Sequence, residues 1–301
     1  MSSSTQPRRV TLAATQMACD WDVDANIARA ERLARKAADQ GANIILLQEL
    51  FETPYFCIEQ DAKHFALATR PEDNRAIRHF RPIAKELGAV LPISFFERAN
   101  HAFFNTTAII DADGEVMGLY RKSHIPNGPG YQEKHYFNPG DTGFKVWDTR
   151  HGRIGLGICW DQWFPETARS MAVMGAEMLL FPTAIGTEPP PSPPHNSREH
   201  WQRTQQGHAA ANVMPLMASN RIGVERSTQN PDSNWLRFYG SSFIADHLGA
   251  KVAEAPEDQE AVVTATFDLA EIRAYRENWG IYRDRRPDLY GPVRTLDGTT
   301  R

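Results

Sequence analysis

Three residues that can act together in acyl chemistry each stand where a short apolar segment ends. Glu49, Lys122 and Cys159 follow residues 43–48, 115–120 and 153–158. A thiolate attacks a carbonyl carbon, a carboxylate accepts the thiol proton, and an ammonium group stabilises the resulting oxyanion. The residue types therefore indicate acyl transfer to water through a thioester on Cys159, without a metal or an organic cofactor.

The position of these residues along the chain strengthens this interpretation. A nucleophile on a sharp strand-to-helix turn is exposed at the rim of a sheet, where α/β folds keep their chemistry. Taken singly, Cys159 is typical of a small buried hydrophobe, Glu49 of a helix cap and Lys122 of a surface charge. Their shared placement at strand ends favours a site, in which the backbone N–H of Trp160 is a second oxyanion donor.

The composition narrows the class of protein. The chain has 301 residues, 41% hydrophobic and 23% charged, which is ordinary for a globular protein. A formal net charge of −4 gives no electrostatic reason to bind nucleic acid or an anionic membrane, and no apolar run is long enough to span a bilayer. The three cysteines include no close pair, which favours a reducing, cytoplasmic location.

The hydrophobic pattern alternates between strands and helices, which predicts a mixed α/β fold. The predicted strands and hairpin arms are 10–17, 43–48, 89–96, 103–110, 115–120, 144–148, 153–158, 177–183, 213–220, 238–246 and 261–268. The predicted helices run from about residue 22 to 40 and over 72–87, 165–174 and 198–212.

No repeat or linker divides the chain, so we predict one domain at residues 9–301, after a disordered tail at 1–8. A C-terminal arm begins at about Leu269 and carries aromatic and charged residues at 279–286. This composition suits a contact with another subunit, and equally an arm packed on its own subunit.

Three segments that flank the candidate residues resemble the signatures of the nitrilase superfamily. They lie at 48–51, 120–126 and 157–166 and include Lys122-Ser-His-Ile-Pro126 and Cys159-Trp-Asp. The resemblance covers nearly the whole chain. It implies a four-layer αββα sandwich, a Glu49–Lys122–Cys159 triad, and cofactor-free homo-oligomers built from dimers. It also implies a second glutamate at Glu133, which either orients the substrate amide or tunes Lys122.

Further segments, at 128–147, 159–166, 182–188 and 238–243, look like the N-carbamoylputrescine amidase branch of that superfamily. This resemblance implies hydrolysis of a cationic carbamoyl amine to putrescine, CO2 and ammonia. Relatives that act on carbamoyl amino acids place arginines just after the nucleophile, where this chain has Gln162 and Trp163. The alternative is another carbamoyl or aliphatic amide hydrolase of the superfamily, and the length of the diamine stays open.

A cationic substrate needs an anionic acceptor at the far end of its pocket. Glu188 follows the strand next in sequence to the nucleophile strand, so we expect it to bind the amine; a solvated loop carboxylate is the alternative. Tyr55, Phe56 and Trp160 are candidates for the apolar wall of the pocket, or for ordinary core.

The histidines do not indicate a metal site. His195, His200 and His208 lie in or near one predicted helix, but a zinc site would also need an acid at ligand spacing, and no HExxH pattern occurs. His124 lies close to Lys122, where a Cys–His pair is conceivable, yet pairing of the lysine with a glutamate explains the neighbourhood better. We therefore predict no metal.

Overall fold

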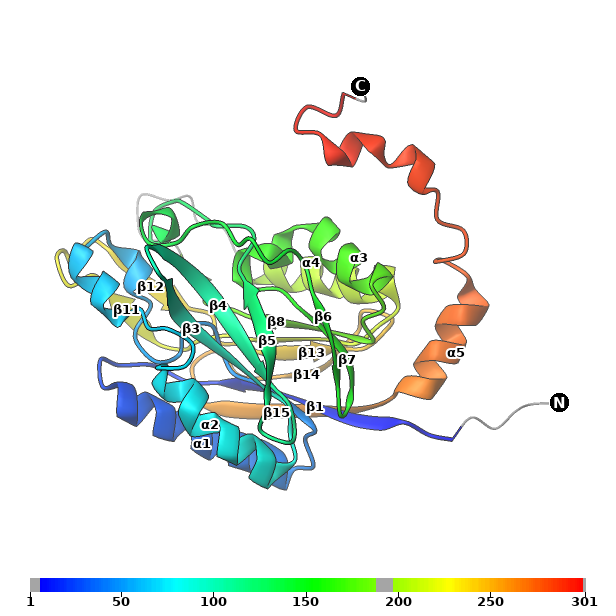
Figure 1. The fold of residues 1–301 in the computed structure, drawn as a ribbon, viewed down its shortest axis with the longest axis horizontal. Helices are drawn as coiled ribbons and strands as arrows, with labels where there is room; N and C mark the ends of the chain where they lie inside the picture. The colour runs from blue at the N-terminus through cyan, green and yellow to red at the C-terminus, as the bar shows by residue number, and fades with distance from the viewer. Residues whose placement is uncertain (1–5, 188–196, 300–301) are drawn as a thin grey trace.

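Two layers of β-structure lie face to face between two layers of helices (Figure 1). The computed structural model describes residues 6–187 and 197–299. In the first layer the strand order is β15 (Ala261–Asp268), β1 (Arg9–Gln16) and β2 (Ile44–Leu46). A backbone bridge from Ile44 to Val90 places beside them the meander β3 (Leu91–Ala99), β4 (Ala102–Ile110) and β5 (Val116–Arg121).

The second layer is a six-stranded sheet that carries the nucleophile strand. Its order is β14 (Lys251–Glu254), β13 (Phe243–Ala245), β10 (Leu216–Ser219), β8 (Met178–Pro182), β7 (Gly152–Leu156) and β6 (Val146–Thr149). Strands β7, β8 and β10 are parallel to one another. Their carboxyl ends therefore meet at one edge, where the polar residues that follow them come together.

The helices cover the outer faces of both layers. Helices α1 (Val23–Asp39) and α2 (Arg75–Leu87) pack on the first layer, and α3 (Pro165–Val173) and α4 (Ser197–Asn212) pack on the second. Side chains of Asp22 and Asn74 cap the amino ends of α1 and α2, satisfying backbone N–H groups that have no partner within the helix. Gly88 ends α2 in the left-handed conformation.

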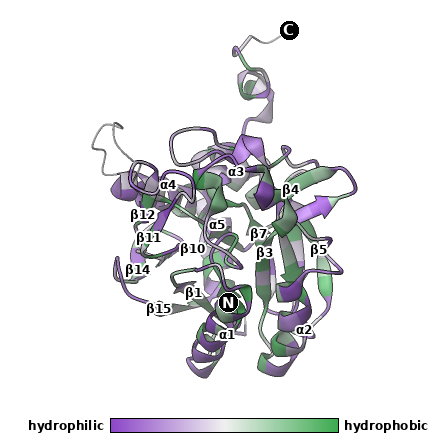
Figure 2. Ribbon diagram, turned by 90° about the vertical axis from the view of Figure 1, so that its left-hand side faces the viewer, coloured by the Kyte–Doolittle hydropathy of each residue, from purple (hydrophilic) through white to green (hydrophobic). Residues whose placement is uncertain are grey.

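Three apolar cores hold these four layers together. One lies between α1, α2 and the first layer, one between the two layers of strands, and one between the second sheet and helices α3 and α4. Figure 2 shows the hydrophobic colour concentrated on inner strands such as β3, β4 and β7, with hydrophilic colour on α1 and α2. The observed layers are those of the predicted αββα sandwich, and the inner strands are apolar on both faces because each is covered on both sides.

Some predicted elements are wrong in detail. The expected single strand at 238–246 is instead parts of two strands, β12 (Trp235–Phe238) and β13. Gly240 and Ser241, which lie between them, both adopt positive φ angles and interrupt the extended conformation. Strand β12 instead joins β11 (Val224–Arg226) and β9 (Gly186–Thr187) in a small sheet that the sequence analysis did not predict.

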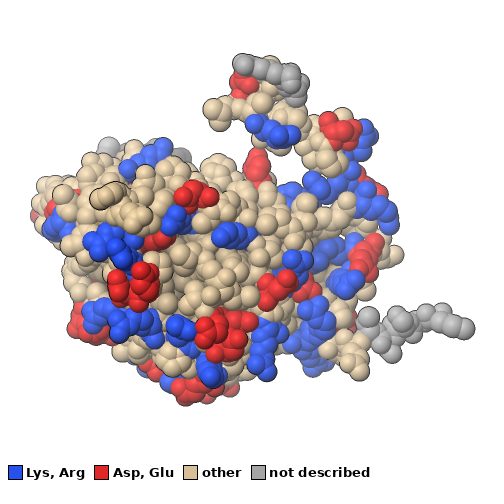
Figure 3. All heavy atoms as spheres, viewed as in Figure 1, with Lys and Arg blue, Asp and Glu red and all other residues tan. Residues whose placement is uncertain are grey.

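The C-terminal arm begins with helix α5 (Leu269–Trp279), capped by Asp268. Beyond it, Tyr282 packs on the third core, and the last described residues, up to 299, extend away from the body of the molecule (Figure 1). On the face shown in Figure 3, basic and acidic side chains are interspersed over the surface. Among the described residues, no helix has the length and apolar character needed to cross a membrane.

Candidate active site

Cys159 stands on a tight turn between β7 and α3. It begins a short 3₁₀ helix, Cys159–Trp163, and has a left-handed φ of 43°. A Cβ atom on Gly157 would lie 2.8 Å from the ring of Phe181 and 3.1 Å from the Cβ of Asp161, so the close approach of the turn to its neighbours requires glycine. The thiol is buried, with Sγ 3.8 Å from the carbonyl oxygen of Ala184.

Lys122 lies directly after β5 and is completely buried. Its Nζ donates to Glu49 Oε1 at 2.8 Å and to both carboxylate oxygens of Glu133 at 2.8 and 2.7 Å. Buried charges require partners of this kind, because removing them from water is costly. The structure therefore brings Glu49, Lys122 and Glu133 together from three separate parts of the chain.

The two carboxylate oxygens of Glu49 have different surroundings. Oε1 accepts hydrogen bonds from Lys122 and, at 2.7 Å, from Nδ2 of Asn105 on β4. Oε2 is buried and has no hydrogen-bond partner among the described residues. One oxygen of this carboxylate is fixed by hydrogen bonds, and the other is free to accept a proton; we call Oε2 the open oxygen. This arrangement suits a base that accepts a proton from a neighbouring thiol. Asn105 was not predicted as a site residue, because its partner lies 56 residues away in the sequence.

Burial and neighbouring charge set the resting protonation states. Burial raises the pKa of the Cys159 thiol well above its usual value, and the charge of Glu49 raises it further. Burial opposes the charge on Lys122, but the charges of Glu133 and Glu49 raise its pKa overall. Burial also raises the pKa of Glu133. The resting site thus holds a neutral thiol beside a charged lysine, and attack by Cys159 requires a base.

Asp161 connects the segment that carries Lys122 to the turn that carries Cys159. Its Oδ2 accepts from the backbone N of Ile158 at 2.9 Å and from the Tyr120 hydroxyl at 2.8 Å. Its Oδ1 accepts from the backbone N of His124 at 3.0 Å and is 2.7 Å from His124 Nδ1. This role was not predicted, although Asp161 stands two residues after the nucleophile. His124 therefore pairs with Asp161.

A cavity of about 210 Å³ opens beside the thiol. Its lining, taken from described residues, is apolar and aromatic: Pro126, Asn127, Gly128, Pro129, Tyr131, Cys159, Trp160, Trp163, Ala184, Ile185 and Ser197. The aromatic faces of this lining suit a cationic amine, which is attracted to the ring quadrupole. Trp160 lies in this lining.

Two other predicted wall residues lie elsewhere. Tyr55 is completely buried behind the cavity, with its hydroxyl donating to Glu133 Oε1 at 2.5 Å. Phe56 packs against Phe96 and lines a different cavity. The expectation that these two form the cavity wall is therefore corrected. Glu188 lies outside the described residues.

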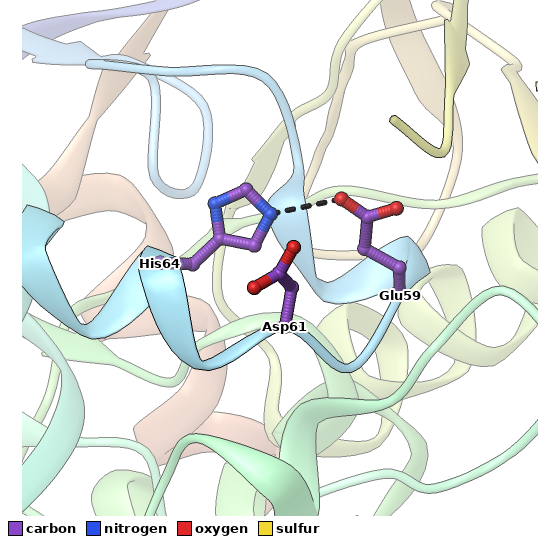
Figure 4. Close-up of side chains that lie close together, drawn as sticks. All are labelled: Glu59, Asp61 and His64. Carbon is purple, nitrogen blue, oxygen red and sulfur yellow. Dashed lines mark hydrogen bonds and ion pairs between the residues drawn. The ribbon is translucent and has the colours of Figure 1, made fainter. Parts of the chain in front are cut away.

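A second group of titratable side chains consists of Glu59 and Asp61, which lie between η1 (Phe56–Ile58) and η2 (Ala62–Leu67), and His64 on η2 (Figure 4). The Glu59 carboxylate accepts from Ser227, Thr228, the backbone N of Gln229 and His64. Lys63 Nζ lies 2.9 Å from Asp61 Oδ2 and 3.9 Å from Glu59 Oε1. The acidic oxygens thus already hold protein donors, including an ammonium group, which describes a structural cluster.

Comparison with known proteins decides the family. The model of the carbon-nitrogen hydrolase family matches residues 11–277. This chain belongs to the carbon-nitrogen hydrolase family. The expected membership of the nitrilase superfamily, the αββα fold and the cysteine-dependent hydrolase class are thereby confirmed.

Within the carbon-nitrogen hydrolases, several relatives are similar over nearly their full length. An N-carbamoylputrescine amidase of Solanum lycopersicum is 58% identical over 292 residues, which cover 97% of each chain. A citrullinase of Francisella tularensis subsp. tularensis is 49% identical over 94% of this chain and 98% of its own. A crystal structure of a carbon-nitrogen hydrolase from Helicobacter pylori G27 has 37% identity and a TM-score of 0.89 over 96% of this chain and 99% of that chain.

Proposed function

We propose that this carbon-nitrogen hydrolase converts N-carbamoylputrescine to putrescine, CO2 and ammonia, as expected from the sequence. The observation that carries the proposal is the 58% identity with an N-carbamoylputrescine amidase over 97% of both chains. The apolar, aromatic cavity beside Cys159 supports it, because it suits a four-carbon chain that ends in an ammonium group.

The arrangement of charges supports a two-stage mechanism. Cys159 attacks the ureido carbon while its proton passes to the open oxygen of Glu49. Lys122 and the backbone N–H of Trp160 stabilise the oxyanion. The tetrahedral adduct expels ammonia, with Glu49 returning the proton, and leaves a carbamoyl thioester on Cys159.

Water resolves that thioester in the second stage. Glu49 accepts a proton from the attacking water, the carbon–sulfur bond breaks, and the thiol regains its proton. The product is a carbamate, which loses CO2 to release putrescine. Glu133 holds both of its oxygens on Lys122, which supports the role of tuning the lysine over that of orienting the substrate amide.

Replacing the nucleophile tests this mechanism. Cys159→Ala is expected to reduce ammonia release from N-carbamoylputrescine at least about 10⁴-fold while thermal unfolding stays cooperative. Cys57→Ala is the control, because Cys57 is also a buried thiol. Substantial turnover by Cys159→Ala would exclude the thioester route.

Hydrolysis of citrulline is the second candidate function, favoured by the 49% identity with a citrullinase. Citrulline presents the same ureido group but adds a carboxylate at the far end. Steady-state rates on N-carbamoylputrescine, citrulline, N-carbamoyl-β-alanine and a simple aliphatic amide distinguish the possibilities. A higher kcat/KM for either carboxylate-bearing substrate would overturn the proposed cationic specificity.

We also propose that Glu188 binds the substrate amine. Glu188→Gln is expected to raise KM for N-carbamoylputrescine about tenfold and to leave KM for a neutral amide within about twofold, since only the former carries an ammonium group. An equal rise for both substrates would contradict this role.

The same proposal includes a homo-oligomer built from dimers, in a cytoplasmic setting. The exposed apolar side chains of the arm support the assembly: Trp279, Leu289 and Val293 are 63%, 60% and 65% exposed. The three free cysteines fit a reducing compartment.

A further inference from the structure

A buried ion pair holds the segment that carries Glu49. Arg221 follows β10 and is completely buried. Its guanidinium donates to three backbone carbonyl oxygens of this segment: Glu49 and Thr53 at 2.9 Å, and Leu50 at 2.5 Å. A fourth hydrogen bond, at 2.9 Å, reaches Glu225 Oε1 on β11.

Glu225 extends this connection to the other side of the site. Its second oxygen, Oε2, accepts from the backbone N of Tyr55. The hydroxyl of Tyr55 in turn donates to Glu133, which binds Lys122. The Arg221–Glu225 pair therefore fixes both ends of segment 49–55, one at Glu49 and the other at the support of Glu133.

The backbone of this segment is strained at Leu50, one of the residues whose carbonyl oxygens bind Arg221. Leu50 has a φ of 50°, a conformation that costs a residue with a Cβ atom about 1 kcal/mol or more. The two adjacent carbonyl oxygens, Glu49 and Leu50, both point to one Nη2 of Arg221. The planar guanidinium fork supplies several donors in fixed directions, which a lysine does not.

Stability alone is a weak explanation for such a pair. The desolvation cost of a buried ion pair often equals or exceeds its attraction, so apolar pairs of similar volume are frequently as stable. Here the Arg221–Glu225 pair binds the backbone of Glu49 and so sets the direction of its carboxylate, whose Oε2 is the open oxygen. A displacement of about 1 Å in a reacting group can cost about 100-fold in rate.

We propose that Arg221 and Glu225 are positioning residues of the reaction, which hold the backbone of Glu49 so that its open oxygen faces the thiol of Cys159. The proposal rests on the proposed function only for the role of Glu49 as the base. It assigns neither residue a contact with substrate.

Two variants test it. Arg221→Lys keeps the charge but loses the fork, and is expected to lower kcat about 30-fold with KM within threefold. Arg221→Met combined with Glu225→Gln removes both charges, keeps an acceptor for the backbone N of Tyr55, and is expected to lower kcat about 100-fold. For both variants, kcat is measured on the substrate, among those compared above, that the parent hydrolyses fastest.

Cys159 alkylation by iodoacetamide at pH 7 is the second readout, and it needs no substrate. With Glu49 displaced, the thiol loses its base, so the alkylation rate is expected to fall at least fivefold in both variants. The proposed substrate can therefore fail in the panel while this readout still decides the role of the pair.

Arg81→Lys is the matched control, because Arg81 binds the carbonyl oxygen of Gly114 and the carboxylate of Glu115 far from Cys159. Its kcat and alkylation rate are expected to equal those of the parent. If the double variant fails to unfold cooperatively, Glu225→Gln alone replaces it, with an expected tenfold fall in kcat. A folded Arg221 or Glu225 variant with kcat and alkylation within threefold of the parent would overturn the proposal.

Discussion

At the scale of single residues, the chemistry of the site depends on which atoms of its charged side chains have hydrogen-bond partners. Lys122 satisfies its three donor directions with two carboxylates, and one oxygen of Glu49 has no hydrogen-bond partner within residues 6–187 and 197–299. This asymmetry is what allows one carboxylate to hold the lysine and still accept a proton. Glu49, Lys122 and Cys159 were proposed because they lie in signature segments, and Glu133 because it matches a second glutamate after the lysine; their catalytic roles stay predictions.

Glu133→Gln tests the two roles that the sequence left open. The change keeps the shape of the side chain but removes one of the two negative charges that lie beside Lys122. Because Glu133 contacts the lysine through both oxygens, we expect kcat to fall about 10- to 100-fold, with KM for N-carbamoylputrescine within about threefold. Steady-state kinetics measure both, and an increase confined to KM would instead indicate that Glu133 orients the substrate.

The supporting residues were not predictable in the same way. Asn105, Arg221 and Glu225 carry no local signal that separates them from ordinary surface polar residues, and Asp161 lies in the signature segment around Cys159, which does not show what it binds. Arg221 and Glu49, for example, are 172 positions apart. Such contacts arise only when distant strands are brought together by the fold, which hydrophobic periodicity does not specify.

At the scale of elements, long periodic segments were predicted well and short strands were not. Helices α1, α2, α3 and α4 have apolar stripes or clear end signals, such as Pro165 at the start of α3 and Gly88 after α2. Strands β9, β11 and β12 have only two to four residues; β11 and β12 pair with each other across a short loop, and β12 also pairs with β9, which lies far away in the sequence. Their small sheet nevertheless holds Glu225 near the site, so the elements hardest to predict support the predicted chemistry.

The loop cluster of Figure 4 supports a prediction about acid stability. Burial acts to raise the pKa of Glu59, but hydrogen bonds led by those from Ser227 and Thr228 lower it from 4.5 to about 2. As the pH falls below about 4.5, the unfolded chain takes up this proton before the folded chain does. The contribution of Glu59 to stability is therefore present above that pH and is lost as the pH approaches 2.

Glu59→Gln should remove this pH-dependent part. Between pH 5 and 3, the free energy of unfolding of the parent is expected to fall by about 2 kcal/mol more than that of the variant. Chemical denaturation at several pH values measures the difference. Glu72→Gln is the control, because its carboxylate is exposed, and its pH slope should match that of the parent. Parallel slopes for parent and Glu59→Gln would contradict the prediction.

At the scale of the whole molecule, the C-terminal arm from Leu269 onwards carries apolar side chains that the rest of the protein does not cover. Tyr282 still packs on the third core and donates to the carbonyl oxygen of Asn212. Beyond it, residues 285–299 expose apolar side chains away from the body (Figure 1). A groove between α3, α4 and the arm, lined partly by Arg169, His208 and Val293, continues this apolar surface. A second copy of the chain is the proposed occupant.

Removing residues 285–301 tests this assembly while keeping Tyr282 in place. Each chain has a mass of 33.9 kDa, so the parent is expected to scatter light as a multiple of that mass and the shortened chain as a smaller multiple. Val293→Asp should act in the same direction, because a carboxylate buried in an apolar contact is costly. Val116→Asp, on the exposed face of β5, introduces the same charge elsewhere and should leave the mass unchanged. Equal masses for the parent and both arm variants would show that the arm packs within its own subunit, the other arrangement that the sequence allowed.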